Sequence, residues 1–226
     1  MWSVLLVCGV ALGDEPSECF GTPADGHLAH GWRLPLRGEN FRAYSHLGHA
    51  VGRTYVHSEV FQVVLEAYRQ LGLRAPTKRY VYGETGLKKG GEFKPHKTHR
   101  NGLSVDFMVP VANGRGESVY LPTHVLNKWG YAIEFDAAGR FGDFVIDAEA
   151  MAEHLYQLDR AATVSGIAVR RVIFDPALQP LLHATRRWRY LEGKIDFSTR
   201  PSWVRHDEHY HVDFTVPCDT GEHPQR

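Results

Sequence analysis

The chain has 226 residues, of which 43% are hydrophobic and 12% aromatic, so it can build one compact domain with a substantial core and is not a disordered chain. Its 26 lysines and arginines balance its 26 aspartates and glutamates, which argues against a protein that binds nucleic acid through a basic surface. The 14 histidines become informative only where they cluster.

The N-terminal residues 1–13 predict a signal peptide. They contain an apolar run from Val4 to Leu12 and end in the small residues Ala11 and Gly13, a pattern typical of a cleavage site. The run is too short to span a membrane; the alternative is an N-terminal strand. We therefore expect a mature domain of residues 14–226 in the periplasm or outside the cell.

Cys19 and Cys218 remain once this leader is removed. An even number of cysteines in an exported chain predicts a disulfide bond that ties the two ends together. The alternative is two unrelated thiols, because the sequence alone does not show that the ends meet.

Irregular structure is expected over residues 14–52, followed by a helix over 57–71. In that helix the apolar side chains recur every three or four residues and Gly72 marks the end. A short strand at 79–82 and a loop rich in Gly and Lys at 83–97 come next. The alternation of residues 103–109 predicts a strand with Asp106 on the face opposite to Phe107.

The second half of the chain predicts a strand at 131–135, a turn at 136–139, and a helix to about Thr163 that is capped by Asp147. A buried strand over 167–174, a helix that opens at Asp175-Pro176, and a last strand within 205–216 follow. Helices and strands do not alternate regularly, and neither a repeat nor a linker is visible. The expected fold class is therefore α+β, a single domain with a central antiparallel sheet flanked by helices.

Two histidine-rich segments have the spacing of a metal site. In the first, His99 precedes a glycine bend at Gly102, and Asp106 lies in a strand. In the second, His209 and His211 are two residues apart, so on a strand they share a face. Zinc in catalytic sites takes three imidazole or carboxylate ligands and a water, so these segments predict a zinc site in which one histidine binds metal and the other faces the water.

Three stretches of the chain resemble the penicillin-insensitive murein endopeptidases. They are the two histidine-rich segments and a third stretch between them: His96-Lys-Thr-His99-Arg-Asn-Gly-Leu-Ser-Val-Asp106-Phe, Arg200-Pro-Ser-Trp-Val-Arg-His206-Asp-Glu-His209-Tyr-His211-Val, and Val172-Ile-Phe-Asp-Pro-Ala177. That family belongs to the metallopeptidase superfamily of lysostaphin, D-Ala-D-Ala carboxypeptidases and hedgehog domains. The resemblance extends from about Cys19 to Cys218. It implies an α+β fold and one catalytic zinc ion, and its substrate would be the peptide cross-links of peptidoglycan.

Residue by residue, the resemblance implies His99, Asp106 and His211 as zinc ligands. His96 becomes an extra ligand or a group behind the ligands. His209 becomes the catalytic histidine beside the metal-bound water, and His206 a further active-site histidine. A second metal described for the family would need an Asp-x-x-His motif. This chain has Asp136-Ala-Ala-Gly139 there and lacks the histidine, so a second metal is not expected.

Glu208 is a second candidate for the general base, because it lies three residues before His211, as in the D-Ala-D-Ala dipeptidase branch. On a regular strand Glu208 points away from the face of His209, and only a turn or bulge brings it back. The expectation is therefore that His209 is the base and Glu208 the second choice.

A basic stretch precedes the metal segment and either attracts the carboxylates of wall peptides or only solvates a loop. It comprises Lys78, Arg79, Lys88, Lys89, Lys94, Lys97 and Arg100. Two other functions remain open: a D,D- or L,D-carboxypeptidase acting on wall peptides, and a zinc-binding module without catalysis. The sequence predicts no nucleic-acid partner and no membrane span, and it does not set the oligomeric state.

Overall fold

The computed structural model describes residues 15–202 and 204–219, so the proposed signal peptide lies outside the described residues. A six-stranded sheet forms the centre, in the order β13-β12-β14-β7-β6-β4. Its strands are β4 (Phe41–Ala43), β6 (Tyr80–Tyr82), β7 (Ser104–Met108), β12 (Ala168–Ile173), β13 (Asp196–Phe197) and β14 (His209–Thr215). The four inner strands pair antiparallel, as expected, whereas both edge strands pair parallel, so the sheet is mixed.

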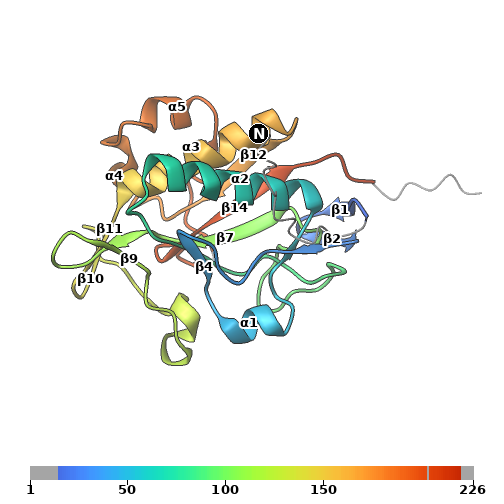
Figure 1. Ribbon diagram of the computed structural model, residues 1–226, viewed down its shortest axis with the longest axis horizontal. Coiled ribbons are helices and arrows are strands. Elements are labelled where there is room, and N and C mark those ends of the chain that lie inside the picture. Colours follow the sequence, from blue (N-terminus) through green and yellow to red (C-terminus); the bar gives the residue numbers. More distant parts are fainter. Residues whose placement is uncertain (1–14, 203, 220–226) are drawn as a thin grey trace, which may run out of the picture.

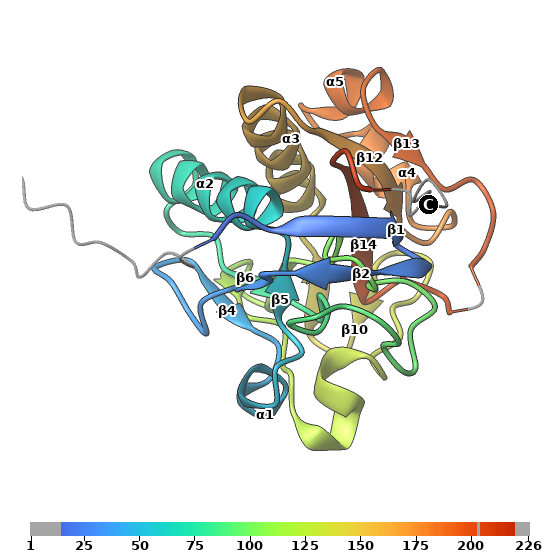
Figure 2. The ribbon, with the colours of Figure 1, turned by 90° about the vertical axis from the view of Figure 1, so that its right-hand side faces the viewer.

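Two long helices, α2 (Ser58–Arg74) and α3 (Ala148–Val164), lie side by side over one face of this sheet (Figures 1 and 2). Both begin at a side chain that accepts a hydrogen bond from the backbone of the first turn: His57 caps α2 and Asp147 caps α3. Their apolar stripes are buried, with Val64 and Leu155 almost inaccessible. Both helices were predicted from these stripes, within three residues of their bounds.

Smaller elements surround the sheet. The hairpin of β1 (Glu18–Thr22) and β2 (Asp25–Ala29) crosses one end of the sheet, and β3 (Trp32–Arg33) pairs with β5 (Tyr55–Val56). A four-stranded sheet contains β8 (Val111–Ala112), β9 (Ser118–Val119), β10 (Arg140–Phe141) and β11 (Phe144–Ile146). The short helices are α1 (His46–Ala50), η1 (Val125–Gly130), α4 (Pro180–His183) and α5 (Trp188–Glu192). Among the described residues, no helix is long and apolar enough to cross a membrane.

Four expected elements differ from the structure. Residues 131–135 form no strand. They belong to an irregular segment that buries the side chains of Ile133 and Phe135, and the backbone N–H of Phe135 donates a hydrogen bond to Asp207. The helix expected at Asp175-Pro176 begins only at Pro180, after a turn in which Asp175 accepts from the backbone of Ala177.

The third and fourth differences are the N-terminal region and a strand. The range 14–52, expected to be irregular, contains β1 to β4 and α1. β12 is buried on one face only, through Val169 and Val172, because its other face meets solvent. The last strand lies within the expected range 205–216 and starts only at His209, since residues 205–208 form an irregular segment before it. This late start matters for the site, because it frees Glu208 from the alternation of the strand.

Candidate metal centre and cleft

The pairing of β7 with β14 places Asp106 directly opposite His211 on the sheet face away from α2 and α3. The neighbouring side chains Phe107 and Tyr210 point to the other face, where both rings pack against His154 of α3. Strand alternation therefore puts His209, His211 and Asp106 on one surface, as the sequence predicted. Nδ1 of His211 lies 2.9 Å from Oδ1 of Asp106.

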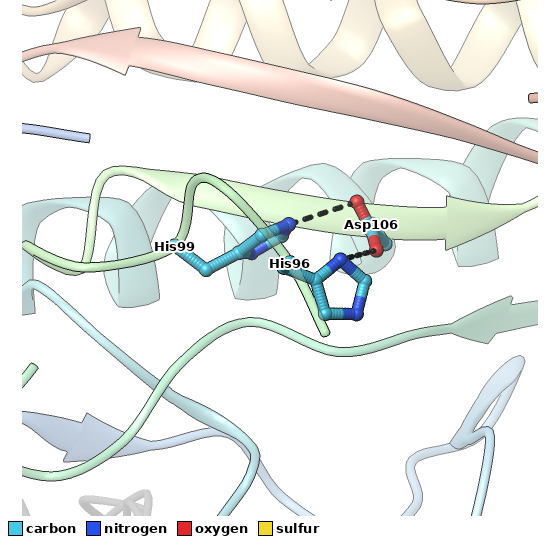
Figure 3. Close-up of side chains that lie close together, drawn as sticks. All are labelled: His96, His99 and Asp106. Atoms are coloured by element: carbon cyan, nitrogen blue, oxygen red, sulfur yellow. Dashed lines mark ion pairs between the residues drawn. The ribbon is translucent and has the colours of Figure 1, made fainter. Parts of the chain in front are cut away.

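The loop between β6 and β7 brings two more histidines to the same carboxylate. Nε2 of His99 lies 3.2 Å from Oδ1 of Asp106, and Nδ1 of His96 lies 4.0 Å from Oδ2 (Figure 3). Gly102 turns the chain between them with φ +78°, where an added Cβ would come within 2.7 Å of the backbone N of His57. The predicted bend at this glycine is thus confirmed.

Asp106, His99 and His211 each make a further contact that orients the side chain. Nδ1–H of His99 donates to the carbonyl of Thr85 at 3.2 Å, which leaves Nε2 facing Asp106. The Tyr131 hydroxyl donates to Oδ2 of Asp106 at 3.1 Å. Nε2 of His211 lies 2.7 Å from Oδ1 of Asp213. Metal-binding imidazoles and carboxylates are commonly oriented by such contacts.

This donor set suits a metal ion. His96, His99 and Asp106 each offer a ligand atom within 4.8 Å of the others, and they form a group that could hold an ion. Nε2 of His99 is buried, lacks a hydrogen-bond partner and faces the carboxylate. Such an arrangement is expected of an imidazole nitrogen whose lone pair binds a metal ion. His211 contacts the same carboxylate, so all four proposed metal residues meet at Asp106.

The charges of the site point the same way. Burial alone would raise the pKa of Asp106, but the surrounding histidines hold that pKa well below its usual value, so the carboxylate stays ionised. Burial lowers the pKa of His99, which keeps its ring neutral. For His211 burial is outweighed by Asp213 and Asp106, which raise its pKa to about 10. The pocket therefore favours a positive charge beside Asp106, the place where a metal cation would sit.

The irregular segment before β14 supplies the remaining candidates. Nδ1–H of His209 donates to Oε1 of Glu208 at 2.8 Å, and Nε2 of His209 faces Oδ2 of Asp106 at 3.8 Å. Glu208 lies outside the regular strand and turns its carboxylate back onto its neighbour. Burial lowers the pKa of His209, but Glu208 and Asp106 outweigh that effect and raise it.

His206 occupies a left-handed backbone conformation with φ +56°, which non-glycine residues adopt rarely. Its Nδ1–H donates to the carbonyl of Val204 at 2.6 Å, and its ring lies 4.6 Å from that of His209. Mainly through burial, the pKa of His206 is lowered to about 4, so this imidazole is neutral near pH 7. Ion pairs from Arg205 to Asp175 and Asp207 hold the segment in place.

A cleft of about 770 Å³ opens above these groups. His96, His206, His209 and His211 line its floor. Leu47 of α1 and Val51, which follows α1, supply one wall, and the turn at Lys128 and Trp129 supplies another. Lys128 and Trp129 both have left-handed backbones, with φ +50° and +56°. Such strain is tolerated where the surroundings enforce it, often at functional sites.

The basic stretch predicted before the metal segment is only partly at the cleft. Lys94 and Lys97 line it, whereas Lys78 forms an ion pair with Asp147 and Arg79 donates to the carbonyl of Pro76. The other expected members, Lys88, Lys89 and Arg100, are not among the described residues that line the cleft. Asp136, considered for a second metal, accepts from the backbone of its own turn.

Sequence reasoning missed four residues of this region: Arg53, Glu84, Lys128 and Tyr131. The buried Glu84 forms an ion pair with the partly exposed Arg53, and Tyr131 joins Asp106 to the backbone N–H of Glu84. None of them belongs to a spaced motif, so no pattern in the sequence singles them out. Only the fold brings them beside the histidines.

The mixed sheet of this α+β fold carries histidines and an aspartate that could hold a metal ion beside an open cleft. The comparison with known families gives a narrower answer. The family described as penicillin-insensitive murein endopeptidase matches residues 19–225. The chain therefore belongs to this family, as its motifs indicated. No curated protein matches the chain.

Proposed function

We propose that this protein is a zinc-dependent endopeptidase that cuts the peptide cross-links of bacterial peptidoglycan. Its family name indicates murein endopeptidase activity, and the zinc dependence rests on the buried, unpartnered Nε2 of His99 that faces Asp106. The proposed ligands are His99, Asp106 and His211, with His96 beside them. A zinc ion held there would polarise the scissile carbonyl and acidify a water molecule.

His209 is the proposed general base. Its Nδ1–H is held by Glu208, so the unprotonated Nε2 faces the metal centre and the cleft. It takes a proton from the attacking water and returns it to the leaving amine. Glu208, which does not line the cleft, acts by orienting His209 and by stabilising its protonated form.

His206 is proposed to orient His209, the general base. Its Nδ1–H is already donated to the carbonyl of Val204, so Nε2 is the nitrogen that remains for the cleft. The left-handed backbone conformation of His206, with its positive φ, places the ring beside that of His209. Because the neutral ring carries its single proton on Nδ1, Nε2 has a lone pair and accepts a hydrogen bond, so His206 can orient the groups beside His209 but does not donate to the oxyanion.

Two measurements test the proposal. Metal analysis of the purified protein should give about one zinc per chain, and His211→Ala should lower that content. Digestion of purified wall fragments, followed by mass spectrometry, should convert cross-linked dimers into monomers. Monomers that each lose one residue would indicate a carboxypeptidase instead, and zinc binding without any hydrolysis would indicate a binding module.

This function places the protein in the periplasm or outside the cell, where peptidoglycan is found. The Cys19–Cys218 disulfide fits such an oxidising compartment. Wall peptides carry several carboxylates, and the lysines along the cleft suit them.

A further inference from the structure

Glu84 is a buried carboxylate that lies directly behind His96. It follows β6, is 8% exposed, and its Oε2 lies 2.5 Å from Nε2 of His96. A carboxylate accepts hydrogen bonds and cannot donate them when ionised, so the proton of the neutral His96 ring must sit on Nε2. The lone pair of the ring is then on Nδ1, the nitrogen that faces Oδ2 of Asp106.

The position of the Glu84 carboxylate is itself determined by two side chains, Tyr44 and Arg53. The Tyr44 hydroxyl donates to Oε1 at 2.7 Å, and the guanidinium of Arg53 pairs with both carboxylate oxygens through Nε and Nη2. Arg53 is held in turn by a hydrogen bond to the carbonyl of Lys94 and by the ring of Phe93. This arrangement leaves Oε2 directed at His96 and gives the carboxylate little freedom to move.

The same network reaches the ligand Asp106. The Tyr131 hydroxyl accepts from the backbone N–H of Glu84 at 2.8 Å and donates to Oδ2 of Asp106. Glu84 therefore stands next to two of the groups that surround the metal position. Only His96, however, is contacted by its side chain.

We propose that Glu84 is a positioning residue that fixes the Nε2–H tautomer of His96 and so makes Nδ1 of His96 a metal ligand. This inference rests on the proposed zinc site and extends it, because it makes His96 a ligand rather than a group behind the ligands. Glu84 itself touches neither metal nor substrate.

The first experiment measures zinc affinity by competition with a chelator. Glu84→Gln should weaken zinc binding about 10- to 100-fold, the usual effect of losing the partner of a ligating histidine. Tyr44→Phe is the matched control: it removes a hydrogen bond to Oε1 but leaves the contact between Oε2 and His96, so zinc affinity should change less than about threefold. Wild-type affinity in Glu84→Gln, or an equal loss in both variants, would overturn the proposal.

A double-mutant cycle separates positioning from a general structural effect. In a His96→Ala background, Glu84→Gln should cause no further loss of zinc affinity, because Glu84 acts through the missing ring. Additive losses would show that Glu84 acts elsewhere. Should wild-type protein bind no zinc, the proposed function fails as well; zinc binding and hydrolysis with an additive cycle would remove only this inference.

A second measurement needs no variant and covers the case in which Glu84→Gln does not fold. Long-range ¹H–¹⁵N spectra of the ¹⁵N-labelled, metal-free protein report which ring nitrogen of each histidine carries the proton. For His96 the proton should be on Nε2. A proton on Nδ1 would contradict the proposal, since that nitrogen would then have no lone pair for the metal.

Discussion

At the scale of single residues, the contact between Glu208 and His209 assigns different roles to the two candidate bases. If His209 is the base, His209→Ala should lower kcat by about 10²–10⁴-fold while zinc stays bound. Glu208→Gln should cost less, about tenfold, because it only weakens the orientation of the ring. The double variant should be no slower than His209→Ala, since the two residues act as one unit.

Steady-state kinetics on a cross-linked muropeptide, with zinc content measured in parallel, provide the check. A larger loss in Glu208→Gln than in His209→Ala would make Glu208 the base. Loss of zinc in His209→Ala would instead make His209 a ligand.

His154, on the opposite face of the sheet, predicts acid sensitivity of the fold. It is fully buried, stacks on Tyr68, accepts a hydrogen bond from Tyr210, and leaves Nε2 without a partner. Burial lowers its pKa to about 3. In the unfolded chain a histidine has a pKa of about 6.5, so below that pH the unfolded state binds the extra proton and stability falls as the pH drops towards 3.

Between pH 7 and pH 5 this one group should reduce the free energy of unfolding by roughly 2 kcal/mol. His154→Phe keeps an aromatic ring and removes the titration. Urea unfolding at both pH values, in wild type and variant, isolates the effect as the difference between the two pH dependences. Identical pH dependences would show that His154 is protonated without cost in the folded protein.

At the scale of elements, patterns that depend on one segment were predictable from the sequence. The stripes of α2 and α3, the cap at Asp147, and the shared face of His209 and His211 all follow from local periodicity. The strand expected at 131–135 was wrong because apolar residues in an irregular segment resemble those of a strand, and burial there depends on a distant partner, Asp207.

The site divides in the same way. The candidate metal segments were found by their spacing, because neighbouring residues on a strand or turn supply the proposed ligands. The groups behind them were not found, because Glu84 reaches His96 and Tyr131 reaches Asp106 only through the folded arrangement of β6, β7 and the turn after η1. A lone Glu or Tyr in a loop has no distinguishing sequence pattern.

The turn at η1 carries a prediction about substrate binding. The side chain of Asn127 stabilises this turn, because it accepts a hydrogen bond from the backbone N–H of Gly130 and donates one to the carbonyl of Pro122. The turn places Lys128 and Trp129 at the cleft. An exposed cation at this wall should attract a substrate carboxylate. Lys128→Gln should raise KM for wall peptides about two- to fivefold, in line with an exposed ion pair, with little change in kcat.

Lys89→Gln is the control for this variant, since it removes the same charge from an exposed position that is not among the residues lining the cleft. The difference in KM between wild type and Lys128→Gln should shrink as salt is added, because salt screens exposed charges. An equal effect of both variants would attribute the change to net charge alone.

At the scale of the whole molecule, the Cys19–Cys218 disulfide joins the first strand to the segment after the last one. Cys19 lies in β1, and the hairpin of β1 and β2 touches the loop that carries His96 and His99. The backbone N–H of Leu28 donates to Lys89 at 3.0 Å, and that of Arg100 donates to Pro23 at 3.1 Å. The disulfide thus secures a hairpin that supports the metal loop.

Removal of this disulfide should weaken both the fold and the metal site. The bond closes a loop with a sequence separation of 199 residues, for which the chain-entropy argument gives an upper limit of about 5 kcal/mol of stabilisation. The Cys19→Ser/Cys218→Ser double variant should therefore unfold at lower denaturant concentration than the oxidised protein. Under conditions where both are folded, it should also bind zinc more weakly, because the hairpin no longer holds the loop between Lys89 and Arg100.

Urea unfolding and chelator competition measure the two effects, with reduced wild-type protein as the control that leaves both side chains in place. A large loss of stability without any change in zinc affinity would show that the metal loop keeps its geometry independently of the hairpin.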